Sequence, residues 1–356
     1  MTQYSSILTG IHPLSEALIN GIFDLKYGRA VSSDHVIKAF ERDIIDLIAI
    51  LVKISPEAVS IGNLGWWDIF RPFTEGFQRL TTQGTLGNLP VTRIPLTNTF
   101  YRQPIISTKV SPKEPVLKTA NHPFLEGNIL QIKYLPTNLK RNAWSVCLPG
   151  PYTFSRASDI MSKSQKAYSS QNELMVDFSK ILCGELTYLA NEGFSHVVID
   201  ESYFTWDSLD NDTQPLLLEL WNQLSVASSL RVIIHTHQFL SNEKLQLLLE
   251  SKSWGIGIDC IRTDIQKLLD YDFNGKSIVA GVVDSQSYFR SVNGELLVEK
   301  VADLVQVGND LAEAQVKNIV LSPTSRLEYI PRSVADLKLE KIGKAIKKLQ
   351  NNEESQ

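Results

Sequence analysis

Ionisable side chains follow the predicted β-strands of this chain, at the points where the strands end. Asp200 and Glu201 follow one β-branched run, His237 follows the next, and Asp259 and Asp284 follow two later runs. The strand bodies are nearly free of such groups. Because parallel strands end on one side of a sheet, these side chains are expected to surround one concave polar site. Carboxylates and imidazoles there could hold a cation, move a proton or bind a metal ion.

A zinc ion could be held at such a site if three or four of these groups met. The candidate ligands are Asp200, His237, Asp259 and Asp284. Cys260 is the only cysteine near a strand end, so the thiolates that soft metals prefer are missing. His237 is therefore interpreted either as a metal ligand or as a hydrogen-bonded histidine of a binding site. No GxSxG elbow, Walker loop or GxGxxG fingerprint indicates another chemistry.

Short β-branched runs alternate with amphipathic stretches, which predicts βαβ units and a parallel sheet. Strands are expected over residues 5–9, 57–61, 144–148, 196–200, 231–236, 254–258, 277–282 and 318–321. Helices are expected over residues 14–27, 34–53, 169–192, 213–227, 242–250, 263–270, 295–312 and 332–349. This pattern predicts a single (β/α)₈ TIM barrel over residues 1–349, followed by a disordered tail at 350–356. Residues 71–143, rich in Pro, Thr and Asn, are expected to form an insertion between strands two and three, with loops and a hairpin over the barrel mouth.

Composition narrows the classes of function. The 356 residues carry a formal net charge of −4, which argues against a nucleic-acid partner. No apolar run is long enough to span a membrane, and no signal peptide is visible. Three widely spaced cysteines fit a reducing cytoplasm. Lys338 and the other lysines of the last helix are expected to form a solvated face.

The serial order of the strand-end motifs resembles the catalytic barrel of cobalamin-independent methionine synthase. The motifs are GPYTFSRAS (150–158), IDES (199–202), HTHQF (235–239), GIDCIRTD (257–264), GVVDSQS (281–287) and SPTSRL (322–327). The likeness covers roughly residues 144–345, and GIHPLSEAL near the N-terminus is similar to the family's first loop. It implies a TIM barrel, and it also fits the separate N-terminal-type barrel of split archaeal forms, which lacks the zinc site.

The resemblance also assigns roles to individual positions. It implies that His237 takes the place of the family's zinc-binding histidine and Asp259 that of its zinc-binding glutamate. The two thiolate positions fall on Phe239 and Ser325, neither of which can act as a thiolate, so the resemblance implies a degenerate zinc site. The family's pterin-stacking tryptophan falls on Ala157. Substrate-binding positions are implied or expected at His12, Asn63, Asp68, Asp200, Glu201 and Asp284.

Two functions follow from the resemblance, and zinc-free chemistry, as on the decarboxylase side of the same superfamily, is a third possibility. The first is methyl transfer to an amino-acid thiol such as homocysteine, with methyl-folate, methyl-pterin or methylcobalamin as the undetermined donor. The second is a non-catalytic barrel that binds the methyl donor or partners a zinc-bearing methionine synthase. The missing thiolates favour the second function, whereas the retained Asp200, His237 and Asp259 favour a working pocket.

Overall fold

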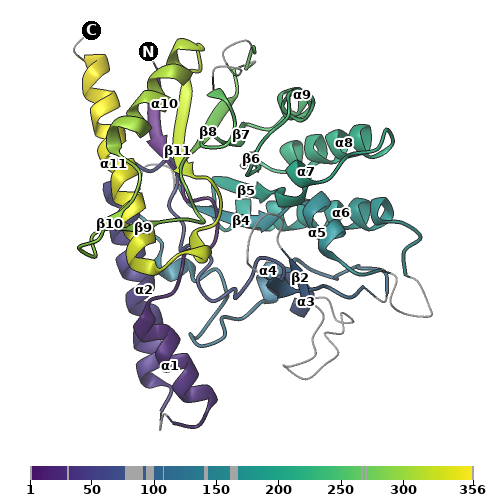
Figure 1. Ribbon diagram of the computed structural model, residues 1–356. Coiled ribbons are helices and arrows are strands. Elements are labelled where there is room, and N and C mark those ends of the chain that lie inside the picture. The colour runs from purple at the N-terminus through teal and green to yellow at the C-terminus, as the bar shows by residue number, and fades with distance from the viewer. Residues whose placement is uncertain are drawn as a thin grey trace.

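A curled sheet of parallel strands forms the centre of the protein (Figure 1). The computed structural model describes residues 2–29, 32–76, 91–93, 100–106, 108–139, 143–160, 167–265, 268, 271–273 and 275–354. In these ranges the sheet has seven strands, in the order β1-β11-β8-β7-β6-β5-β4. Their bounds are β1 Gln3–Ser6, β4 Ser145–Pro149, β5 His196–Asp200, β6 Arg231–His235, β7 Gly255–Asp259, β8 Ser277–Val283 and β11 Asn318–Pro323.

Strands β4, β5, β7 and β8 are buried at every position. Such strands lack apolar/polar alternation because both of their faces are covered. Helices α6 (Gln171–Asn191), α8 (Thr213–Val226) and α9 (Asn242–Glu250) lie along one part of the outer face, and α10 (Val301–Glu313) and α11 (Arg332–Glu354) along another (Figure 1). The sequence therefore predicted the α/β class and all seven of these strands to within a few residues.

The segment expected to be the second strand joins the sheet through single bridges only. Ser6 bridges Pro56 and Val59 bridges Trp144, both in parallel. The amide of Glu57 donates to the Ser6 carbonyl at 2.7 Å, and that of Val59 donates to the Ala143 carbonyl at 2.7 Å. Residues 55–59 therefore contact both edge strands of the sheet, β1 and β4, without forming a regular ladder with either.

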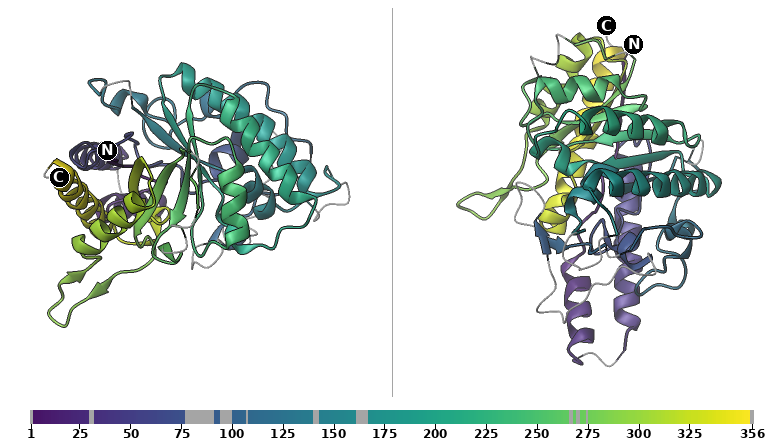
Figure 2. Two further views of the ribbon diagram at one scale, coloured as in Figure 1. Left: turned by 90° about the horizontal axis from the view of Figure 1, so that it is seen from above. Right: turned by 90° about the vertical axis from the view of Figure 1, so that its right-hand side faces the viewer.

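Helices α1 (Glu16–Lys26) and α2 (Asp34–Lys53) pack against each other and project from the body (Figures 1 and 2). The Ser15 hydroxyl accepts a hydrogen bond from the Leu18 amide at 3.2 Å, which fixes where α1 begins. α2 carries its apolar residues on one face, buried against α1 and α11. Among the described residues, no helix combines the length and apolar character needed to cross a bilayer.

The expected insertion contains short elements and one hairpin. They are α3 (Arg71–Gly76), the antiparallel pair β2 (Val91–Arg93) and β3 (Phe100–Arg102), α4 (Val116–Thr119) and the 3₁₀ turn η1 (Ile132–Tyr134). The hairpin was expected, although residues 77–90 and 94–99 lie outside the described residues. Tyr101 of β3 is buried and donates its hydroxyl hydrogen bond to Glu328 at the strand-end side of the sheet.

Three expectations for the C-terminal third were wrong. The helix expected from residue 295 begins at Val301, because β9 (Phe289–Arg290) and β10 (Leu296–Leu297) form a projecting hairpin (Figure 2). α11 runs to Glu354, into the segment expected to be a disordered tail. Lys338 is buried rather than solvated, and its ammonium donates to Glu299 at 2.6 and 2.8 Å. Part of the helix expected at 263–270 lies outside the described residues.

Candidate functional site

Three of the strand-end residues predicted from the sequence, Asp200, His237 and Asp259, lie at the ends of neighbouring strands and close to one another. β5, β6 and β7 are neighbours in register, so Asp200 at the end of β5 pairs with His235 on β6. His237 follows β6, and its Nδ1 lies 3.4 Å from the Ser325 hydroxyl. The Gln238 amide donates to Asp259 at 3.0 Å. All of these side chains are buried.

Asp200 is paired with an arginine that the sequence reasoning did not single out. Arg326 follows β11, and its guanidinium donates to Asp200 Oδ2 at 2.8 Å, with both side chains almost wholly buried. The other carboxylate oxygen accepts from the hydroxyl and the amide of Ser202. Burial raises the pKa of Asp200, but Arg326 together with Ser202 outweighs it, so the pKa lies below its usual range. Asp200 is therefore ionised and already has its counter-charge.

Arg326 is held on every side. Its Nε donates to Glu328 at 3.1 Å and its second terminal nitrogen donates to the Tyr329 hydroxyl at 2.6 Å. The guanidinium carbon lies 5.5 Å from the ring centroid of Tyr101 and 5.9 Å from that of Tyr329. Such cation–π contacts add to the ion pair when the cation is desolvated. Burial raises the pKa of Glu328 well above its usual value, and nearby Asp68 raises it further.

A second cluster joins Asp259 to Asp284. The guanidinium of Arg262 lies between them, donating to Asp259 and to Asp284 at 2.9 Å each. Burial raises the pKa of Asp259, although Arg262 opposes the rise. The pKa of Asp284 is lowered, because the Ser287 hydroxyl, the Gln286 amide and Arg262 outweigh burial. The sequence predicted correctly that Asp259 and Asp284 lie close together. The group between them is the Arg262 side chain rather than a ligand.

The four positions that the resemblance aligns with zinc ligands do not fit a zinc ion. Phe239 is 58% exposed and has no donor atom. Asp259 is committed to Arg262 and to backbone amides, and Ser325 offers only a hydroxyl beside His237. Within the described part of the chain, no three His, Cys, Asp or Glu residues are grouped so that they could hold a metal. The residues present therefore supply one imidazole where zinc needs three or four ligands.

Glu201 stabilises the loop rather than facing a ligand. One oxygen accepts from the Thr153 amide at 2.8 Å, and the other accepts from the Tyr152 amide at 3.3 Å and the Trp221 indole at 2.9 Å. These amides begin α5 (Pro151–Ala157), so the carboxylate caps that helix. A Cβ at Gly150 would overlap the carboxylate. Burial raises the pKa of Glu201 to about 7, although these hydrogen bonds oppose the rise.

Two of the remaining predicted residues line a neighbouring cavity of about 400 Å³, His12 and Asn63. Its walls are mainly apolar and include the half-exposed Trp67, with Glu328 from the Arg326 cluster at one side. The side-chain amide of Asn63 donates to the Cys147 carbonyl of β4 at 2.8 Å. Asp68 does not line the cavity, and its carboxylate accepts from the amides of Phe70 and Arg71 at the start of α3.

Among the described residues, five histidines leave a buried ring nitrogen without a hydrogen-bond partner, and three of these lie on β6 or in the loops after β1 and β6. These three are His12 at Nδ1, His235 at both nitrogens and His237 at Nε2. Burial lowers the pKa of His237 to about 3, and the positive charge of Arg326 adds to this, while Asp200 acts in the opposite direction. The imidazole is therefore neutral at physiological pH. His237 Nε2 is an unused hydrogen-bonding atom within the strand-end cluster.

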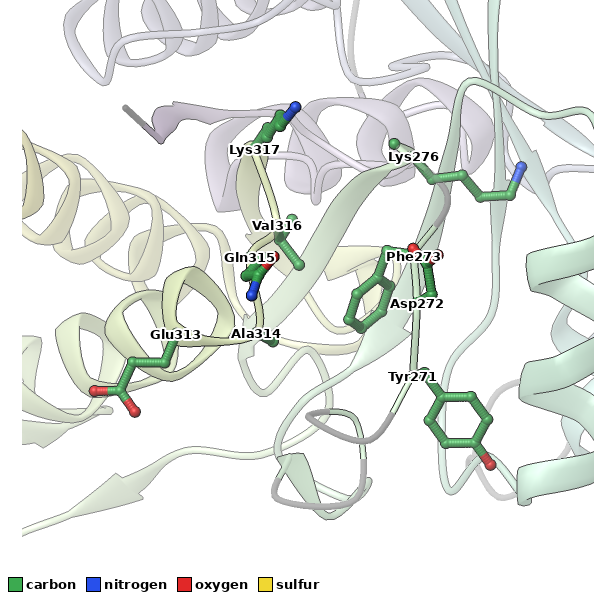
Figure 3. Close-up of a pocket in the computed structure, with 10 residues that line it drawn as sticks. Tyr271, Asp272, Phe273, Lys276, Glu313, Ala314, Gln315, Val316 and Lys317 are labelled. Atoms are coloured by element: carbon green, nitrogen blue, oxygen red, sulfur yellow. The ribbon is translucent and has the colours of Figure 1, made fainter.

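A larger cavity, of about 490 Å³, lies at the opposite ends of β8 and β11. The side chains of Lys276, Glu313 and Tyr271 point away from one another rather than towards a common centre (Figure 3). The Lys276 ammonium is used by the backbone carbonyls of Ser251 and Ser253. In parallel α/β barrels, active sites lie at the carboxyl ends of the strands. The strand-end cluster and the cavity beside it are therefore the candidate functional site.

A curled parallel sheet with a polar cluster at its strand ends defines this chain as a mixed α/β protein. Residues 114–308 match the sequence model of the cobalamin-independent synthase family, N-terminal domain. Because this match covers more than half of the chain, the protein belongs to that family. A curated relative, the 5-methyltetrahydropteroyltriglutamate–homocysteine methyltransferase of Desulforamulus reducens, is 27% identical over 143 residues. That alignment covers 38% of this chain and 18% of the relative, so the chain matches a small part of the relative's length.

Solved structures with the same fold include two vitamin-B12-independent methionine synthases. The Shewanella sp. W3-18-1 protein, described in complex with selenomethionine, has a TM-score of 0.72 at 13% identity, with 99% of each chain covered. The putative synthase from Listeria monocytogenes has a TM-score of 0.67 at 14% identity, with 98% of this chain and 99% of that chain covered. Sequence identity at this level shows the fold alone.

Proposed function

We propose that this protein transfers a methyl group to a small thiol at the strand-end cluster. Family membership supports methyl transfer, and the name of the Desulforamulus relative supports homocysteine as the first acceptor to test. We also propose that residues 55–59, second in chain order, close a (β/α)₈ barrel by lying between the edge strands β1 and β4, and that residues 71–143 form an insertion in this barrel. The bridges of residues 55–59 to both edge strands support that arrangement.

The observation that carries the proposal is the free Nε2 of His237 inside the cluster. A neutral imidazole nitrogen there can accept the hydrogen bond of an S–H group and fix the position of the sulfur. With a thiol pKa of about 8.5, a few per cent of the acceptor is thiolate at neutral pH. Since the pKa of His237 is about 3, His237 orients the thiol but does not remove its proton outright. The proposed role is therefore positioning the sulfur for attack.

The proposed reaction is a displacement at the methyl carbon. A sulfur–carbon bond forms and the bond between methyl and donor breaks, with its electron pair returning to the donor. The thiol proton leaves to solvent or to the donor atom that was released. Methyl-folate, methyl-pterin and methylcobalamin all fit this scheme. We propose that the cavity lined by His12, Asn63 and Trp67 receives the rest of the donor, because its apolar walls and aromatic ring suit a flat heterocycle.

The test is a methyl-transfer assay on chain purified without a histidine tag. The chain is incubated with 5-methyltetrahydropteroyl-triglutamate and homocysteine, and separately with methylcobalamin, and methionine is measured by mass spectrometry. We expect His237→Gln to lower the rate at least tenfold, whereas His35→Gln, on the exposed face of α2, leaves it unchanged. Equal rates for the two variants would contradict the role of His237.

Metal content is measured on the same preparation. We expect far less than one zinc per chain, because the aligned positions lack the ligands. Stoichiometric zinc together with loss of activity on chelation would contradict this expectation. If the chain is inactive with every donor and yet raises the activity of an added zinc-bearing methionine synthase, the accessory function replaces the proposed one.

A further inference from the structure

Arg326 is a fully buried arginine placed at the centre of the candidate site. Its side chain is 0% exposed and that of Asp200 is 1% exposed, with 2.8 Å between their nearest nitrogen and oxygen. A carboxylate buried at a strand end is a natural counter-charge for a cationic group of a bound ligand. Here the chain itself supplies that cation. Asp200 therefore has no charge left to neutralise when a ligand enters.

The surrounding loops are shaped to hold this arginine. Gly10, in the loop after β1, has a φ of +137°, and a Cβ there would lie 2.5 Å from Arg326 Cγ. The Leu327 amide donates to the Ile11 carbonyl at 2.9 Å, which ties the arginine's segment to the same loop. The contacts to Glu328 and Tyr329 occupy its remaining edges. The guanidinium therefore has one well-defined position, against Asp200.

We infer that Arg326 is a specificity-determining residue: it occupies the cation position on Asp200, so the acceptor is a thiol that carries no free ammonium group there. This inference rests on the proposed thiol methyl transfer and names the substrate class. It differs from the direct substrate-binding role that the resemblance implies for Asp200.

The energetic reason is the cost of an unpaired buried charge. A ligand ammonium that paired with Asp200 would have to displace the guanidinium of Arg326, which is fully buried and so is not stabilised by bulk solvent. Breaking a buried ion pair by removing one partner is strongly unfavourable. A thiol without an ammonium group leaves the Asp200–Arg326 pair intact. The pocket should therefore distinguish two thiols that differ only in this group.

L-Homocysteine and 4-mercaptobutanoate are such a pair, because the second is the first with its ammonium replaced by hydrogen. Their affinities are measured by calorimetry under reducing conditions for the wild type and for Arg326→Ala. We expect the wild type to bind 4-mercaptobutanoate at least tenfold more tightly than homocysteine. Arg326→Ala should reverse this order, because Asp200 then needs a cation and the lost side chain leaves room for one.

Arg326→Ala leaves Asp200 unpaired and could fail to fold, so a second variant is included. The double variant Asp200→Asn/Arg326→Gln removes both charges, and we expect it to bind the two thiols equally. Arg42→Ala, which removes an exposed ion pair with Asp46 on α2, should keep the wild-type preference.

Each outcome bears on the inference separately from the methyl-transfer assay. If the wild type binds homocysteine as tightly as 4-mercaptobutanoate, or more tightly, Arg326 is not the determinant, whether or not methyl transfer is observed. If the preference holds but no donor gives a product, the inference stands as a binding property and the proposed reaction fails. If neither thiol binds to the wild type or to either Arg326 variant, the thiol site itself is wrong and the inference is lost with it.

Discussion

Removing the guanidinium of Arg262 should destabilise the fold by about 3 kcal/mol at neutral pH. Arg262 lies between two carboxylates at 2.9 Å, and Asp259 is fully buried while Asp284 is 15% exposed. Removing one partner of a buried ion pair costs about 3–5 kcal/mol. The lower end applies because Arg262 is itself 27% exposed and water can partly replace it. Arg262→Lys should lose about half as much, since an ammonium cannot bridge both carboxylates.

The assay is urea denaturation of the wild type and Arg262→Ala at a series of pH values, with Arg42→Ala as control. Arg42 forms an ion pair of similar length with Asp46, but both side chains are exposed, so its removal should cost less than about 1 kcal/mol. Without Arg262 the folded-state pKa values of Asp259 and Asp284 rise, so the deficit is greatest above pH 7. It should shrink as the pH falls towards 4 and both carboxylates become protonated. A deficit that does not change with pH, or one no larger than that of Arg42→Ala, would refute this account of the cluster.

Two further predictions concern Glu201 and the glycine against it. Gly150→Ala should lower the free energy of unfolding by about 1–3 kcal/mol through overlap with the carboxylate, whereas Gly184→Ala, at a helical position with open space around it, should raise it by about 0.5–1 kcal/mol; urea denaturation of both variants measures the difference. Burial raises the folded-state pKa of Glu201 from 4.5 to about 7. The folded protein therefore holds this proton more tightly than the unfolded chain, and the free energy of unfolding should fall by on the order of 3 kcal/mol as the pH rises from about 4.5 to about 7. Glu201→Gln should remove this slope from the pH dependence of unfolding, and an unchanged slope would assign it to other groups.

The sequence was most informative where burial on both faces dictates composition. The runs that became β5, β6 and β8 are rich in Val and Ile, and their positions could be predicted from that alone. Residues 57–61 have a similar composition but form no regular strand. Pro56 has no amide hydrogen to donate and Ser55 takes a left-handed φ of +54°, so the ladder is interrupted at its start.

Two errors had signals in the sequence. Asn293-Gly294 lies between short apolar pairs and is typical of a hairpin turn, which is what β9 and β10 form. Lys338 stands four residues after Val334 and four before Ile342, on the buried face of α11, so helical spacing alone could have placed it inside.

The role of Arg326 could not be predicted from sequence. The residue that it pairs with, Asp200, is 126 positions away, and nothing local indicates that the guanidinium turns inward. The role of Glu201 could not be predicted either. Its IDES motif indicates a substrate site, but its carboxylate oxygens accept hydrogen bonds from the first amides of α5. Convergence of the strand ends was predictable because parallel topology requires it. Which carboxylates remain open to a ligand depends on side-chain pairing that only the structure shows.

The single bridges at residues 55–59 have a consequence for how the molecule loosens. Elsewhere in the sheet each strand pairs with its neighbour through several successive residues, but here a few isolated backbone hydrogen bonds form the junction on either side. Amide protons on this line should exchange with deuterium sooner than those between β5 and β6, since breaking it costs fewer bonds at once. Residues 55–59 could thus part from β1 or from β4 while β1 stays paired with β11 and the remaining strands stay joined. The seam gives the cavity beside His12 a way to widen that does not require global unfolding.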